Sequence, residues 1–229
     1  MARRGSAATL AADVWQRLRR EILDGELAPG DRLKLADIAE RLDVSIGVVR
    51  EALTRLASQY LVVGQHNYGF RVTTLSRQRL IDLTEFRTTV EQLALRMAIE
   101  RGDLQWESEL LAAYHRMTAV PRQSPERSTM ASEARSEAHL VFHGMLIQAC
   151  GYDELLDLCT QLRDSAAVYW RWSASLPTGE RDIDAEHAAI MQAALDRDAD
   201  RACDALRVHF ARTAELFLSS ATSDTPVPE

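Results

Sequence analysis

The stretch LADIAERLDVSIGVVREALTRL, residues 35–56, decides how the N-terminal part of the chain folds. Its apolar residues recur at helical spacing in two segments, 35–42 and 46–60, which predicts two amphipathic helices. The letters DVS interrupt the pattern, and Ser45 is placed to cap the second helix through its hydroxyl. The stretch is therefore typical of two helices joined by a tight turn.

The flanking sequence completes this motif. A third helical pattern covers residues 8–24 and ends at a glycine, and a Pro-Gly turn follows it. After the second helix, β-branched and aromatic residues interrupted by glycines predict two short strands near 61–64 and 69–73. Helix, helix, turn, helix and hairpin is the order of a winged helix-turn-helix, with three helices and a two-stranded wing. We expect this domain over residues 1–75.

No strand pattern returns in the remainder of the chain, so the fold class is mainly α. The predicted helices cover about 77–101, 104–118, 129–150, 152–174, 183–197 and 199–221. Six helices of this length can form an antiparallel bundle, which we expect over residues 76–222. The last residues, 223–229, are predicted to be a disordered tail.

Composition narrows the class of protein. The chain has 229 residues, of which 46% are hydrophobic and 27% charged, as in a folded soluble protein. No apolar run approaches the ~18 residues needed to cross a membrane, and the N-terminus has no signal-peptide pattern. Three cysteines without a C-x-x-C pair are typical of reduced thiols. We therefore expect a cytoplasmic protein that does not bind membranes.

Charge is divided unevenly along the chain. The formal net charge is -7, but residues 1–75 carry 11 Lys and Arg against 9 Asp and Glu, whereas the rest of the chain is strongly acidic. A mildly basic head on an acidic body is compatible with a nucleic-acid-binding domain on a carrier domain. A difference of this size is common by chance, so the motif carries more weight than the charge.

A helix-turn-helix places its second helix in the major groove of DNA, with the N-terminal residues of that helix at the base edges. Guanidinium groups there can contact phosphate or guanine, because they offer a fork of donors. The predicted DNA-binding residues are Lys34, Ser45, Arg50 and Arg55, together with Gln65 and His66 at the tip of the wing. Each arginine taken alone is equally well explained as solvated surface.

The segments GELAPGDRLKLADIAERLDVSIGVVREALTRL and LVV…GFRV resemble the winged-helix head of the GntR superfamily of bacterial transcription regulators. The resemblance covers residues 10–75 and includes the P-G-x-x-L turn and the V-R-E-A-L helix. It implies a DNA-binding head joined to a ligand-sensing domain, with DNA contacts at Ser45, Arg50, Gln65 and His66. Most members have Arg-Thr-Pro after the serine, whereas this chain has Ile46, Gly47 and Val48, so a family operator sequence cannot be transferred.

Four histidines form the main candidate site of the body. His139 and His143, in AHLVFHGML (138–146), lie four residues apart and therefore on one face of a helix. His187 and His209 each lie 11 residues from Asp198, near which the last two helices turn. Residues equally distant from the turn of a helical hairpin face each other, so all four imidazoles can converge on one metal ion.

The body also resembles the FCD domain, the ligand-sensing domain of the FadR branch of GntR proteins. The residues that carry this resemblance, over about 78–221, are DLTEFRTTVEQLALRMAIERGD, FHGMLIQACG and EHAAIMQAALDRDADRACDALRVHF. The resemblance implies a divalent metal held by one aspartate and three histidines, the latter at His143, His187 and His209. The aspartate position holds His139. A ligand set rich in nitrogen favours zinc, with nickel as a second candidate, over magnesium or calcium.

The family resemblance also implies a small carboxylate as effector. Arg87 matches a family arginine that can face the pocket, and a guanidinium suits a carboxylate. Arg163, Tyr169 and Arg171 are further candidates, each equally well explained by a surface contact or an ion pair between helices. A stacked histidine cluster without metal is the alternative for the metal site.

These observations predict a ligand-responsive transcription regulator, most simply a repressor, and not an enzyme. It should bind a palindromic operator in double-stranded DNA as a homodimer, since one head reads only a half-site. One alternative is a metal-dependent hydrolase fused to a DNA-binding head, with Glu186 as the nearest candidate base, although no H-E-x-x-H motif occurs. Another is a metal-free DNA-binding protein whose bundle serves dimerisation.

Overall fold

The computed structural model of the chain describes residues 7–65, 69–120, 129–173 and 181–220. The described residues fall into two compact units. The first joins the chain up to Leu80 to residues 161–175, and the second joins residues 81–160 to residues 176–220. The mainly helical fold with a small winged head confirms the predicted fold class. The domain limits 1–75 and 76–222 stay predictions, and the tail 223–229 lies outside the described residues.

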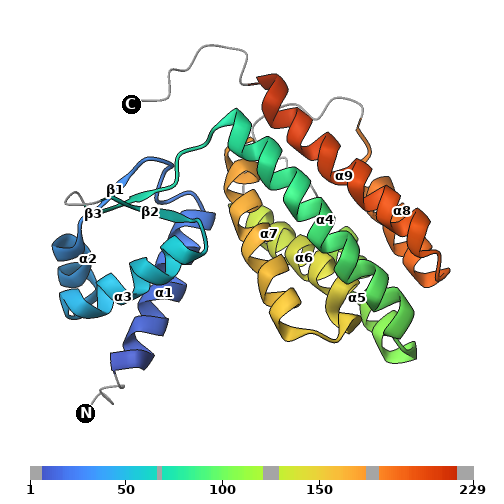
Figure 1. Cartoon of the computed structure of the whole chain (residues 1–229), viewed down its shortest axis with the longest axis horizontal. Helices are drawn as coiled ribbons and strands as arrows, with labels where there is room; N and C mark the ends of the chain where they lie inside the picture. Colours follow the sequence, from blue (N-terminus) through green and yellow to red (C-terminus); the bar gives the residue numbers. More distant parts are fainter. Residues whose placement is uncertain (1–6, 66–68, 121–128, 174–180, 221–229) are drawn as a thin grey trace. The chain divides into compact units, whose positions relative to one another are not determined.

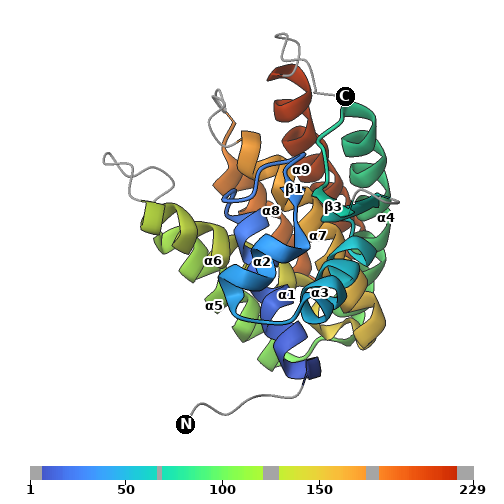
Figure 2. The ribbon, with the colours of Figure 1, turned by 90° about the vertical axis from the view of Figure 1, so that its left-hand side faces the viewer.

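Helices and a small sheet form the head within the first unit (Figures 1 and 2). The elements are α1 Ala7–Leu23, β1 Arg32–Leu33, α2 Leu35–Leu42, α3 Ile46–Ser58, β2 Val62–Gln65 and β3 Gly69–Val72. Helix α3 packs on α1 and α2, and its apolar side, including Leu53 and Leu56, is fully buried against Leu18 and Ile22 of α1. Burying each such side chain stabilises this unit by about 1.5–3 kcal/mol.

The wing has three strands rather than the predicted two. The sheet order is β1-β3-β2, both pairs are antiparallel, and Arg32 lies opposite Arg71. Strand β1 has only two residues, so it shows no alternation of polar and apolar residues from which a strand could be predicted. Gly30 before it has a φ of +89°, and its N–H donates to Val72 at 3.0 Å, which brings the turn to the edge of β3.

Long helices form the second unit (Figure 1). They are α4 Arg77–Arg101, α5 Leu104–Ala119, α6 Thr129–Ile147, the short 3-10 helix η1 Gln148–Cys150, α7 Asp153–Ser173, α8 Ile183–Leu195 and α9 Ala199–Ser220. The division between the two units crosses α7 at Gln161. Helices α5 and α6 pack as one pair and α8 and α9 as another, while α5 also contacts α8.

In the described part of the chain, no helix is both long and apolar enough to cross a bilayer.

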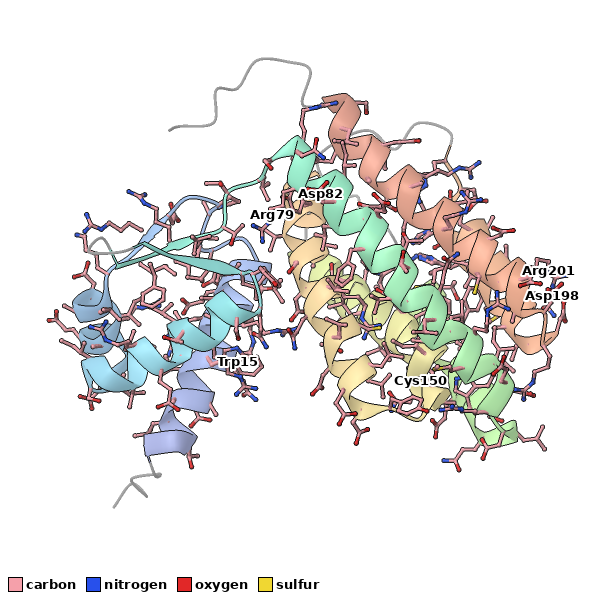
Figure 3. All side chains as sticks on the ribbon, viewed as in Figure 1. Trp15, Arg79, Asp82, Cys150, Asp198 and Arg201 are labelled. Atoms are coloured by element: carbon pink, nitrogen blue, oxygen red, sulfur yellow. The ribbon has the colours of Figure 1, made fainter. Side chains whose placement is uncertain are left out.

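The turn between α8 and α9 lies where the sequence places it. Asp198 donates its N–H to Ala193 at 3.0 Å, and its carboxylate accepts the N–H of Arg201 at 3.0 Å, so it caps α9 (Figure 3). Arg197, in the left-handed region at φ +59°, completes the turn. This tight connection fixes the register of α9 against α8, on which the candidate site depends.

A tight contact between α4 and α5 gives a test of the packing. A Cβ at Gly102 would lie 2.6 Å from a ring carbon of the buried Trp106 and 2.8 Å from the carbonyl oxygen of Ala98. Gly102→Ala should therefore lower the free energy of unfolding by about 1–3 kcal/mol, as overpacking does, in urea unfolding of the full chain. Gly144 in α6 has open space around it, so Gly144→Ala should leave stability unchanged or raise it. Equal effects of the two changes would contradict the packing at Gly102.

Candidate metal centre and nucleic-acid interface

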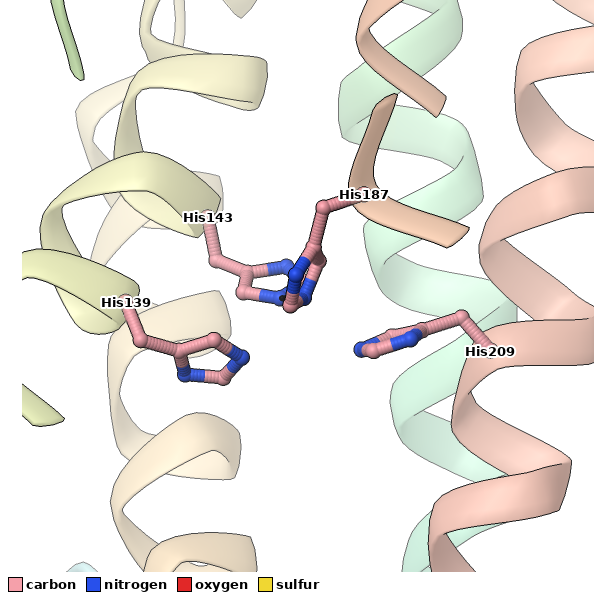
Figure 4. A group of neighbouring side chains, drawn as sticks. All are labelled: His139, His143, His187 and His209. Carbon is pink, nitrogen blue, oxygen red and sulfur yellow. Dashed lines mark hydrogen bonds between the residues drawn. The ribbon is translucent and has the colours of Figure 1, made fainter. Parts of the chain in front are cut away.

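Four histidines from three helices converge in the second unit. His139 and His143 come from α6, His187 from α8 and His209 from α9, and the four rings point toward one another (Figure 4). The ring centroids of His187 and His209 are 4.5 Å apart, as the equal spacing from Asp198 predicted. His143, His187 and His209 are almost completely buried, and His139 is partly exposed. The helical hairpin thus brings together residues that are far apart in the sequence.

The spacing of the nitrogens fits a single metal ion. One nitrogen from each ring can be chosen so that all four lie within 4.8 Å of one another. Nε2 of His143 and Nε2 of His187 are 3.3 Å apart. Two nitrogens bound to zinc at ~2.0–2.1 Å and at a tetrahedral angle are separated by about 3.3 Å. The residues present therefore fit a transition-metal ion in both donor chemistry and spacing.

Glu186 fixes the orientation of one of these rings. Its carboxylate lies 2.8 Å from Nδ1 of His209. Because a carboxylate can only accept, the proton of His209 is on Nδ1, and its Nε2 lone pair is left for the cluster. Arg181 and Arg212 also donate to Glu186, at 2.8 and 3.0 Å. Although burial raises the pKa of Glu186, these hydrogen bonds hold it far below its usual range.

Burial favours the neutral form of His143 and His209. Burial, followed by the neighbouring imidazoles, lowers the pKa of His143 well below its ordinary value. Burial also lowers the pKa of His209, even though the contact with Glu186 acts in the opposite direction. Neutral imidazole is the form that binds a metal, because only this form has a lone pair on its second ring nitrogen. His143 and His209 are therefore deprotonated donors at neutral pH.

Arg87 of α4 lies beside the cluster. Its guanidinium stacks on the ring of Phe210 at 3.9 Å and donates to the buried Glu91 at 2.6 Å. Its charge contributes to lowering the pKa values of His143 and His209. Of the predicted effector residues whose side chains the structure describes, Arg87 is thus the one next to the histidines.

The other three predicted effector residues lie on the part of α7 that belongs to the first unit. Arg163 is buried there. The hydroxyl of Tyr169 accepts the backbone N–H of Ser76 at 3.4 Å, and burial raises its pKa. The side chain of Arg171 lies outside the described residues. Their predicted role in effector binding gains no support from these contacts.

The predicted DNA-binding residues are distributed over the head. Ser45 caps α3, its hydroxyl accepting the N–H of Val48 at 3.4 Å, and Arg50 is exposed one turn further on. Arg55 lies in the last turn of α3 instead, where its guanidinium stacks on Trp15 at 3.8 Å. Lys34 is exposed and pairs with Asp37 at 3.6 Å.

The wing tip is only partly described. His66 lies outside the described residues, as does the side chain of Gln65. The exposed N-terminal end of α3, with Ser45 and Arg50, is therefore a part of the predicted interface that the structure describes.

Comparison with known families identifies both parts of the chain. Residues 10–72 match the family described as bacterial regulatory proteins, gntR family, and residues 82–212 match the FCD domain. The chain belongs to the GntR family. Its head is the DNA-binding domain of that family and its body is an FCD domain, so the protein is a transcriptional regulator and not an enzyme.

Individual relatives agree with this assignment. The chain is 34% identical to the HTH-type transcriptional regulator BphR of Paraburkholderia xenovorans, over 88% of this chain and 82% of the relative. It is 30% identical to the HTH-type transcriptional repressor GlaR of Escherichia coli, over 86% of this chain and 90% of the relative. The solved structure of E. coli McbR/YncC has the same fold, with a TM-score of 0.75, 21% identity, and coverage of 93% of this chain and 98% of that one.

Sequence reasoning missed the hydrogen-bond partners of His209 in this GntR protein. Glu186 was considered only as a base for hydrolysis, but its hydrogen bonds to His209, Arg181 and Arg212 make it a partner of a candidate ligand. The position of Glu186 directly before His187 in the sequence was the one indication that it lies close to the histidines. Nothing in the sequence pairs Arg181 with a residue 28 positions away on α9.

The lowered pKa values of His143 and His209 predict a pH dependence of stability in metal-free protein. Their pKa values are lowered in the folded state, so the unfolded chain binds more protons below pH ~6.5. The free energy of unfolding should be greatest above that pH and should fall on acidification, by up to about 1.4 kcal/mol per pH unit for each such histidine. Urea unfolding of chelator-treated full chain between pH 7.5 and 5.5 measures this slope.

The controls separate the buried cluster from other titrating groups. His143→Gln should flatten the slope, because the deeply buried imidazole is gone. His115→Asn, at an exposed position on α5, should keep it. If both variants show the slope of the unchanged protein, the buried imidazoles are not its source.

Proposed function

We propose that this GntR regulator binds a divalent transition metal through His139, His143, His187 and His209 and senses a small carboxylate at that site. The convergence of the four imidazoles in a buried part of the FCD domain carries the proposal. The second ring nitrogen of His209 is bonded to a carboxylate, as is usual for histidines that bind metals. When bound, the metal would supply open coordination positions for a carboxylate oxygen.

The ligand set suggests which metal is held. Four neutral imidazoles provide nitrogen donors and no negative charge, a combination that favours zinc or nickel over magnesium or calcium. His139 takes the place where the resemblance to the FCD domain implies an aspartate, so the ion would keep more of its positive charge. Zinc is the first candidate, because it accepts four nitrogen donors in tetrahedral geometry.

The surroundings of the histidines favour an anionic effector. Arg87 lies beside the cluster with its guanidinium held between Glu91 and the ring of Phe210. A carboxylate that reaches the cluster would meet the charge of the metal and that of Arg87 together. Moving Arg87 away from Glu91 is a local change by which the bound effector could alter helix α4.

The proposal includes a homodimer that represses its target genes from a palindromic operator. A single head reads one half-site, and two-fold symmetry of the protein matches the symmetry of such DNA. The name of the relative GlaR, a transcriptional repressor, supports repression. Effector binding would change operator affinity by coupling the two sites.

Metal and effector binding can be tested on protein purified without an affinity tag. Elemental analysis should find about one transition-metal ion per chain, or zinc titration should load that amount. In a thermal-shift screen, a small carboxylate should raise Tm in the loaded protein and have little effect after chelation. A bundle that takes up no metal would favour the metal-free alternative, and an equal response to carboxylates with and without metal would contradict the proposed site.

Glu186→Gln provides a sharper test of the centre. The amide weakens the hydrogen bond that orients His209, so zinc affinity should fall by about 10- to 100-fold, as for other outer partners of ligand histidines. Competition against a chromophoric zinc chelator measures this change. Helices α8 and α9 line a groove that includes both Glu186 and Glu215. Glu215→Gln is the matched control, because Glu215 is an exposed carboxylate in this groove. Equal affinities of the two variants would show that Glu186 does not support the metal.

A further inference from the structure

The exposed end of α3 carries two residues that the fold does not require. Ile46 and Gly47 follow the cap residue Ser45, and all three are exposed. Ile46 leaves 49% of its surface in solvent. The two residues after Gly47, Val48 and Val49, are buried and attach α3 to the core. Val48 and Val49 therefore hold the first turn of α3 against the core. Its exposed residues before Arg50 are Ile46 and Gly47, and neither carries a polar or charged side chain.

Neither packing nor backbone conformation requires a glycine at position 47. A Cβ at this position would meet only the hydroxyl of Ser45, at 3.7 Å, which is an ordinary contact. The backbone of Gly47 is not in the left-handed region. Glycine nevertheless lowers the stability of a helix relative to alanine. The small residue is then best explained by something outside the chain that approaches the helix closely.

Ile46 has the chemistry of a contact with thymine. In a helix-turn-helix the N-terminal residues of the recognition helix lie at the base edges of the major groove. A branched aliphatic side chain offers no hydrogen bond there, but it can pack against the C5-methyl group of thymine. An arginine at the same position would donate to guanine instead.

We propose that Ile46 is a specificity-determining residue that recognises a thymine methyl group in each half-site, and that Gly47 lets the backbone of α3 approach the DNA closely enough for this contact. The proposal rests on DNA recognition by the GntR head. It assigns Arg50, one turn further along α3, to phosphate or guanine, so that apolar and charged readout come from successive turns of one helix.

The experiment uses the full chain and a duplex selected from random sequences. Each thymine of the selected site is replaced in turn by uracil, which lacks only the methyl group. Replacement at one position of the half-site should weaken binding about fourfold, the effect of losing one buried methyl group. Replacement of the other thymines by uracil should change the affinity for DNA by less than about twofold, because no buried methyl contact is lost there. If no thymine meets this expectation, the inference is wrong.

Variants assign the effect to Ile46. Ile46→Ala should bind thymine and uracil duplexes equally, and Ile46→Arg should select guanine in place of that thymine. Val63→Ala is the control, because Val63 is an equally exposed apolar residue on β2 (44% of its surface), and this variant should keep the thymine preference. Gly47→Ala should raise Tm while weakening binding. A methyl effect that persists in Ile46→Ala would overturn the assignment, with thermal unfolding confirming that the variant is folded.

The outcomes also distinguish the role of Ile46 from DNA recognition by the GntR head as a whole. If selection yields a preferred sequence but no methyl effect, the head recognises DNA and only the role of Ile46 is wrong. If selection yields no preferred sequence, sequence-specific recognition by this head is wrong, and the role of Ile46 with it.

Discussion

The hydrogen bond between Nδ1 of His209 and Glu186 decides how the His209 ring is presented to the other three histidines. It places the proton on the outer nitrogen, so the lone pair of the inner nitrogen is directed to the other rings. Arg181 and Arg212 keep Glu186 charged and in place. The same bonds remove Glu186 from consideration as a base, because a carboxylate held by two guanidinium groups and one imidazole has little tendency to take a proton. The arrangement is suited to holding an ion rather than to hydrolysis.

The helices could be predicted because their apolar residues repeat at helical spacing over three or more turns. The observed bounds of α4, α5 and α8 lie within two residues of the predicted ones. Strand β1 could not be predicted, since two residues have no period and pair only because the turn at Gly30 carries them to β3. The head was recognisable from local signals, whereas the third strand depends on a contact between distant residues.

The candidate metal centre was predictable for a similar reason. The i,i+4 spacing of His139 and His143 and the equal distances of His187 and His209 from Asp198 depend only on helix geometry. The partners of these histidines do not follow from such spacing. Arg55 shows the same limit in the head, because the helical pattern puts it on an exposed surface but gives no indication that Trp15 of α1 lies below it.

His139 adds a neutral nitrogen donor to the site, where the family resemblance implies an anionic aspartate. With an aspartate in this position, a divalent ion would be half neutralised by its own ligands. Four imidazoles would leave a bound divalent ion its full charge of +2, in a buried environment where charge interactions are poorly screened. Glu91 balances Arg87, and Glu186 is more than balanced by its two arginines, so neither acid offsets the ion. On the proposed function, a metal-loaded centre of this kind would be more stable with an anion bound, and a carboxylate would then serve both as a ligand of the metal and as the missing counter-charge.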